Sequence, residues 1–147
     1  MPCLANYQDN FVVLIGGYRK ASVVCFSFER EDWTKLPSLN KNRDGASACS
    51  VGNSVYVILG LSANSNISRK YTERLSNIGR PDQDTRWTLL ELPEVPQHNF
   101  FRLKTFFVPV SDHEFLVLGG EHLSLKGNLD VHLYDTQDVK VTLLLKE

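Results

Sequence analysis

The chain has 147 residues, and its 42% hydrophobic and 22% charged content excludes an intrinsically disordered protein and predicts one globular domain with a sizeable core. Its 16 basic and 17 acidic residues give a net charge of −1, so we expect no overall attraction to nucleic acid or to an anionic membrane. Every apolar run is far shorter than the roughly 18 residues that a membrane-spanning helix needs.

Strand signals dominate from the N-terminus onward. Four segments of strand composition occupy the first part of the chain, at residues 3–7, 11–15, 22–28 and 33–36. The second of them is continuously apolar, as expected for a strand that is covered on both faces. Polar turn residues separate neighbouring segments, so we expect four antiparallel strands that pair in sequence order.

The pattern then restarts twice. The second group of segments lies at residues 45–51, 55–59, 67–73 and 87–93, and the third at residues 104–110, 115–118, 129–135 and 139–145. In the second group, Gly52 and Asn53 form a strong signal for a two-residue hairpin turn. Helix signals are almost absent, so the sequence predicts three units of four strands each.

Glycine and aromatic residues recur at matching places in these units. Each apolar run ends on glycine, and an aromatic residue and then a tryptophan or its substitute follow. Positions 33, 87 and 141 lie 54 residues apart at each step, and a period near 50 residues indicates a repeat architecture. The recurring positions are Gly16, Gly17, Phe26, Trp33, Gly60, Tyr71, Trp87, Gly119, Gly120 and Tyr134, with Val141 in place of a third tryptophan.

The middle unit departs from the others in two ways. Sixteen residues separate Tyr71 from Trp87, whereas seven separate Phe26 from Trp33, so we expect an exposed insertion at about 74–86. Leu61 stands where the other units have a second glycine. Because that glycine plausibly serves a left-handed or closely approached backbone, Leu61 predicts a locally different turn.

On these spacings the chain resembles the kelch-repeat family of β-propellers. The resemblance covers about 140 residues and implies an all-β fold: a kelch-type β-propeller segment of three four-stranded antiparallel blades, as a partial or open propeller. We place blade 1 at about 1–43, blade 2 at about 44–102 and blade 3 at about 103–147. In such blades the tryptophans and aromatic residues fill the space between neighbouring sheets, so we expect them to be buried.

Three blades do not close a ring, because propellers typically need four to eight. Three explanations remain open at this point. The chain is a fragment of a longer propeller with further blades, it associates with a second copy to close six blades, or its end faces are capped. The in-phase cut at both ends favours the fragment.

The sequence offers little for catalysis, and we expect no enzyme activity, no cofactor and no metal site. The four histidines, at positions 98, 113, 122 and 132, show no zinc-like spacing, and no nucleophile-elbow or phosphate-loop motif occurs. Three cysteines, Cys3, Cys25 and Cys49, form neither an even disulfide set nor a C-x-x-C pair. Together with an N-terminus that lacks signal-peptide features, they indicate a cytoplasmic protein with reduced thiols.

Function is therefore expected in loops on a rigid scaffold. In kelch propellers one face is built from the loop after the double glycine and the loop that joins consecutive blades, and it holds partner peptides. Carried onto this chain, the resemblance nominates Tyr18, Arg19, Lys20, Asn42, Arg43, Asn64, Ser65, Asn66 and Arg102. Arg43 fits best, because arginine makes bidentate contacts to carboxylates.

The resulting prediction is a non-catalytic protein-interaction module, a scaffold or substrate-recognition arm that binds a partner peptide or loop. Two alternatives stay open. The chain is part of a galactose-oxidase-like propeller enzyme, which would need a copper site with Tyr, His and a cross-linked Cys. Otherwise it is a cytoskeletal, actin-associated kelch protein, which a surplus of basic residues would favour.

Overall fold

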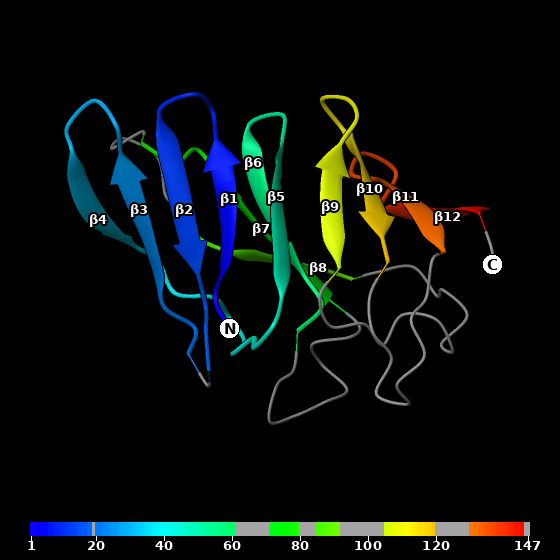
Figure 1. Ribbon diagram of the computed structural model, residues 1–147, viewed down its shortest axis with the longest axis horizontal. Coiled ribbons are helices and arrows are strands. Elements are labelled where there is room, and N and C mark those ends of the chain that lie inside the picture. The colour runs from blue at the N-terminus through cyan, green and yellow to red at the C-terminus, as the bar shows by residue number, and fades with distance from the viewer. Residues whose placement is uncertain (19, 61–70, 80–84, 92–104, 120–129, 146–147) are drawn as a thin grey trace.

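The computed structural model describes residues 1–18, 20–60, 71–79, 85–91, 105–119 and 130–145 (Figure 1). Within these ranges the chain forms twelve strands and no helix. The strands are β1 (Cys3–Tyr7), β2 (Phe11–Ile15), β3 (Val23–Ser27), β4 (Asp32–Leu36), β5 (Ser47–Val51), β6 (Ser54–Ile58), β7 (Tyr71–Ser76), β8 (Thr88–Glu91), β9 (Phe106–Pro109), β10 (Glu114–Leu118), β11 (Val131–Asp135) and β12 (Lys140–Leu145). None of the described residues belongs to a helix long and apolar enough to cross a membrane.

The strands pair into three four-stranded antiparallel sheets in sequence order: sheet 1 (β1–β4), sheet 2 (β5–β8) and sheet 3 (β9–β12). The first strands of the sheets lie side by side, with β1 against β5 and β5 against β9 (Figure 1). This confirms the predicted all-β fold of three blade-like sheets, which are not closed into a ring.

The limits of the third strand in the middle unit differ from the prediction. Strand β7 spans Tyr71–Ser76, whereas the sequence suggested 67–73. Leu75 is fully buried, so 74–76 belong to the sheet and not to the expected insertion. The surplus residues therefore begin after Ser76, and their central part, 80–84, lies outside the described residues.

Sheet 2 is covered on both faces because its strands alternate between two apolar clusters. Val55 and Val57 of β6 pack into one cluster with residues of sheet 1 such as Val13. Tyr56 and Ile58, the next residues along the same strand, pack into another with residues of sheet 3 such as Phe115. A strand with two buried faces must be apolar throughout, which explains the unbroken run of β6.

Backbone conformation corrects the alignment of the middle repeat. Strands β2, β6 and β10 end at Ile15, Ile58 and Leu118, and the next residue in each case has a positive φ: Gly16 (69°), Leu59 (64°) and Gly119 (64°). Leu59 therefore takes the place of the first glycine, and Gly60 (φ 85°) that of the second. The alignment was thus shifted by one position, and Leu59 is the residue that departs from the glycine pattern. Leu61, where the sequence predicted a different turn, lies outside the described residues.

The same registers reassign the aromatic position of the second unit. Val12 pairs with Phe26 and Phe115 with Tyr134, and the equivalent pair in sheet 2 is Val55 with Leu75. Leu75, and not Tyr71, thus corresponds to Phe26. Tyr71 lies half-buried at the other end of the same strand.

The two tryptophans differ sharply in exposure. Trp87 is buried between sheets 1 and 2, where its Nε1–H donates to the Pro37 carbonyl oxygen at 2.9 Å. Trp33 is 59% exposed, so the expectation that it fills an inter-sheet gap is wrong for this structure. The physical reason is that Trp33 pairs with Phe26, on the face of sheet 1 opposite to buried Val23 and Cys25, and no other described sheet covers that face.

Candidate binding surface

Two of the nominated loops meet at the end of the sheets that carries the N-terminus. The carbonyl oxygen of Arg43 lies 2.9 Å from where a Cβ on Gly16 would stand, so the double-glycine loop packs directly on the connection between sheets 1 and 2. The backbone N–H of Gly45 donates to the Met1 carbonyl oxygen, and the Met1 ammonium pairs with Asp44. The loop, the connection and the N-terminus thus form one continuous surface, the loop end.

Three nominated side chains of the loop end are solvent-exposed: Tyr18, Lys20 and Asn42. Tyr18 is the most open of them, with 69% of its surface exposed. A backbone hydrogen bond from Lys20 to the Gly17 carbonyl oxygen, at 3.1 Å, closes the turn that presents it. The other nominated residues, Arg19, Asn64, Ser65, Asn66 and Arg102, and the repeat position Gly120, lie outside the described residues.

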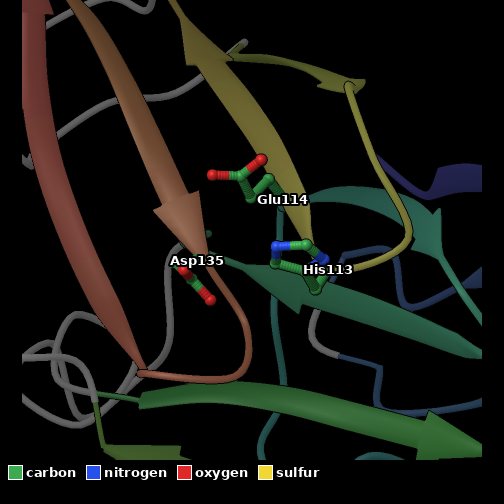
Figure 2. Close-up of side chains that lie close together, drawn as sticks. All are labelled: His113, Glu114 and Asp135. Carbon is green, nitrogen blue, oxygen red and sulfur yellow. The ribbon is translucent and has the colours of Figure 1, made fainter.

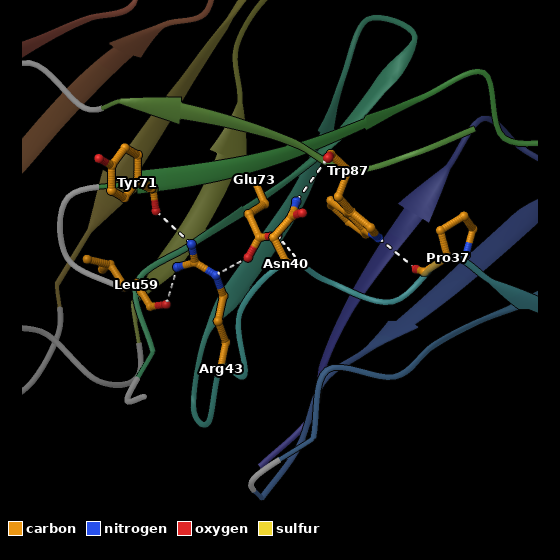
Figure 3. A network of polar contacts seen from close by, with 7 residues as sticks. All are labelled: Pro37, Asn40, Arg43, Leu59, Tyr71, Glu73 and Trp87. Atoms are coloured by element: carbon orange, nitrogen blue, oxygen red, sulfur yellow. Dashed lines mark hydrogen bonds and ion pairs between the residues drawn. The ribbon is translucent and has the colours of Figure 1, made fainter. Parts of the chain in front are cut away.

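Arg43 does not belong to this exposed set. Its side chain is completely buried, so the expectation of a solvent-facing arginine that grips a partner is wrong. Nε donates to Oε1 of Glu73 at 2.8 Å, and the two terminal nitrogens donate to the carbonyl oxygens of Leu59 and Tyr71, each at 2.8 Å (Figure 3). The planar fork of arginine suits this task, because it bonds three acceptors at once.

Asn40 extends the buried network to a second point of the connection. The other carboxylate oxygen of Glu73 accepts from the backbone N–H of Asn40 at 2.6 Å and from its side-chain amide at 3.1 Å. That amide also donates to the Trp87 carbonyl oxygen at 2.9 Å (Figure 3). The connection between sheets 1 and 2 is therefore fixed to sheet 2 at both Asn40 and Arg43, which makes the loop end a rigid platform.

A cavity of about 490 Å³ opens beside the loop end. Its walls come from the starts of the three inner strands, at residues 1–4, 45–48 and 105–107, and none of these residues has a charged side chain. Gly17 adjoins the same N-terminal segment, since a Cβ there would lie 3.9 Å from the Pro2 nitrogen. The loop end thus combines exposed polar groups with an apolar recess.

The three cysteines are free thiols, with Cys3 half-buried and Cys25 and Cys49 buried. Burial raises the pKa of Cys3, which lines the cavity, to about 11 and that of Cys49 to about 12. Desolvation also raises the pKa of Cys25. Because the thiolate and not the thiol reacts, these raised pKa values disfavour reaction of the three side chains at neutral pH.

A second group of polar side chains lies at two adjoining hairpin turns of sheet 3, β9–β10 and β11–β12 (Figure 2). The ligand-type atoms of His113, Glu114 and Asp135 lie within 4.8 Å of one another. Glu114 accepts a hydrogen bond from the Ser111 hydroxyl at 3.1 Å, and Asp135 accepts from the backbone N–H groups of Gln137 and Asp138. Those two bonds lower the pKa of Asp135. We assign these half-buried groups to stabilising their own turns.

The outer faces of the two end sheets expose large apolar side chains that the sequence analysis did not single out as a site. On sheet 1, Phe26 packs against Phe28 and Trp33 with ring centroids 5.4 and 5.2 Å away, and the latter two rings are more than half exposed. On sheet 3, Phe106 is 72% exposed. The sequence contained a signal for these faces. The strands of the first and last sheets are apolar on both faces, although each of these sheets has a neighbouring sheet on one face only.

A comparison with known proteins found no matching family model and no matching curated protein.

Proposed function

We propose that the protein is a non-catalytic interaction module of the kelch type, which binds an acidic peptide or loop of a partner protein at the loop end. The observation that carries this proposal is that three exposed polar side chains lie near an apolar cavity at the loop end. Tyr18 and Lys20 come from the double-glycine loop, and Asn42 comes from the connection that the buried ion pair holds in place. Three free thiols support a reducing compartment, and we place the protein in the cytoplasm.

The chemistry of the loop end favours a partner with both a carboxylate and an apolar side chain. The ammonium of Lys20 offers a charge-assisted hydrogen bond, Asn42 offers amide donors and an acceptor, and Tyr18 offers an aromatic face. The nearby carboxylate of Asp44 is already paired with the N-terminal ammonium, so it opposes an incoming anion less. An apolar side chain of the same peptide enters the cavity, and the removal of its surface from water contributes to the free energy of binding.

Rigidity makes such a surface effective. Ordering a loop on binding reduces affinity, whereas a connection already held by Arg43 and Asn40 is ordered beforehand. Both residues therefore contribute to recognition through position, without touching the partner.

The test is to pan a displayed library of short random peptides against the 147-residue chain and to measure the affinity of the enriched peptides. We expect acidic peptides with one large apolar residue, and an affinity at least about tenfold lower for Lys20→Glu, because a charge-assisted hydrogen bond contributes roughly 1.5–3 kcal/mol. Tyr18→Ala should also weaken binding.

Lys140→Glu is the matched control. Lys140 is an exposed lysine at the start of β12, and this part of sheet 3 lies away from the loop end. Peptides without acidic residues, or an equal loss of affinity in Lys20→Glu and Lys140→Glu, would contradict the proposal.

A further inference from the structure

The two interfaces between sheets are built in the same way. Each sheet has a forward face, which points to the following sheet, and a backward face, which points to the preceding one. At both interfaces a forward face meets a backward face. Val13 of sheet 1 and Val57 of sheet 2 belong to one buried cluster, and the ring centroids of Tyr56 in sheet 2 and Phe115 in sheet 3 are 5.9 Å apart. The stack therefore repeats one mode of packing and leaves one face of each kind uncovered by the described sheets.

The backward face of sheet 1 is one of these open faces. The centre of this face is apolar. One cross-strand row runs Leu4, Leu14, Val24 and ends on Lys35, and the next begins at Asn6 and runs Val12, Phe26, Trp33. Leu4 and Trp33 are each 59% exposed. A contiguous apolar surface of this kind on a soluble protein marks an interaction site.

Comparison of the two tryptophans indicates what kind of partner covers this face. Trp33 pairs with Phe26, the counterpart of Leu75. Arg74 pairs with Thr88, so the same register places Trp87, the residue just before β8, opposite Leu75. Trp87 is buried by the forward face of the preceding sheet. Trp33 is thus placed to receive the forward face of another sheet.

The forward face of sheet 3 is the other open face, and it has the matching character. One row runs from Phe106 through Leu118 and Val131 to Leu145, and the neighbouring row contains Val108. Phe106, Leu145 and Val108 are all exposed. Leu118 ends its strand as Ile15 and Ile58 do, and these two equivalents are buried at the internal interfaces.

We propose that two copies of this chain associate head to tail, with the forward face of sheet 3 in one copy packed on the backward face of sheet 1 in the other. A two-fold axis forms this contact twice and covers both open faces in a ring of six sheets. A second copy is the occupant that the observations favour, because this one chain carries both complementary faces. The contact does not involve Tyr18, Lys20 or Asn42. Leu4 and Phe106 also line the cavity beside the loop end, so the contact is tested at Trp33 and Val108, which lie outside that cavity.

The test is sedimentation velocity of the 147-residue chain over a range of concentrations, with variants on each face. We expect wild type to sediment as a species of twice 16.7 kDa. Trp33→Glu and Val108→Glu should each be monomeric, because each places a charge in both contacts. Tyr18→Glu, which changes an equally exposed aromatic residue at the loop end, is the matched control and should remain a dimer.

Mixing the two monomeric variants distinguishes head-to-tail packing from symmetric face-to-face packing. An equimolar mixture contains one undamaged pair of faces, so it should regain a dimer of reduced affinity. Circular dichroism checks folding, and Leu145→Glu, on the same face and outside the cavity, replaces Val108→Glu if that variant is unfolded. A wild-type monomer at all concentrations, open chains of more than two copies, or a mixture that stays monomeric would each overturn the proposal.

Discussion

Arg43 and Glu73 form an ion pair in which neither side chain reaches solvent, with 2.8 Å between Nε and Oε1. The arginine comes from the connection between sheets 1 and 2, and the glutamate from β7, thirty residues later in the chain. Arg43 also donates to two backbone carbonyl oxygens, and the second carboxylate oxygen of Glu73 accepts from the backbone N–H of Asn40. Such additional hydrogen bonds offset the large desolvation cost of a buried pair.

Breaking this pair should destabilise the fold strongly. We expect Arg43→Met to reduce the free energy of unfolding by about 3–5 kcal/mol, because it leaves the Glu73 carboxylate buried and uncompensated. Urea unfolding followed by circular dichroism measures the change. Lys20→Met, at an exposed position of the neighbouring loop, should change stability by less than about 0.5 kcal/mol.

The double variant Arg43→Met/Glu73→Leu separates the charge from the packing. Because an apolar pair removes both charges, it should be clearly more stable than Arg43→Met alone. A double variant as unstable as the single one would show that the arginine acts through shape and its carbonyl contacts.

The two tryptophans should respond differently to truncation, in dilute solution where copies do not associate. Trp87→Ala should reduce the free energy of unfolding by about 3–5 kcal/mol, because it opens a cavity between sheets 1 and 2. It also leaves the Pro37 carbonyl without its indole donor. Trp33→Ala should reduce it by less than about 1 kcal/mol, since that ring is mostly in water. Equal losses in thermal unfolding would contradict the assignment of the faces.

Gly16 should resist substitution for two reasons. Its φ of 69° disfavours any residue with a Cβ, and that Cβ would lie 2.9 Å from the Arg43 carbonyl oxygen. We therefore expect Gly16→Ala to reduce the free energy of unfolding by more than about 1 kcal/mol. The converse change, Glu31→Gly, replaces an exposed residue with φ 55° and should leave stability unchanged or raise it. Equilibrium unfolding in urea measures both, and an unaltered Gly16→Ala would argue against this loop conformation.

Stability should decrease in alkaline solution. Burial raises the pKa of Cys3 from 9.0 to about 11 and that of Cys49 to about 12. A group whose pKa is higher in the folded state stabilises the fold fully below the unfolded value, and its contribution is lost as pH rises through the folded value. We therefore expect the midpoint of urea unfolding to fall from about pH 9 toward pH 11–12.

Cys49→Ala tests the origin of this dependence. The variant should be less stable at pH 7, because a buried side chain is truncated, but its stability should decline less steeply above pH 9. An unchanged slope would assign the alkaline loss to other groups, among them Tyr134, whose pKa burial raises to about 12.

Much of the architecture follows from the sequence alone. Strands such as β1 and β2 were predicted with their observed limits, because alternation, apolar runs and turn residues act over a few neighbouring positions. The pairing order followed as well, since each sheet is a meander in which consecutive strands are neighbours. The repeat period then indicated three sheets of four strands.

Tertiary structure decided the roles of individual residues. Trp33 and Trp87 occupy similar sequence contexts, yet only Trp87 is covered by a neighbouring sheet. Burial of the tryptophan therefore depends on a neighbour that the local sequence does not encode. The local sequence predicts that Arg43 is an exposed charge in a loop. Its burial depends on Glu73, which only the tertiary structure brings close to it. Leu59 adopts a glycine-like φ because surrounding packing outweighs its local preference. Local chemistry thus determined the strands, and contacts between segments distant in sequence determined which side chains are buried and which are free to bind.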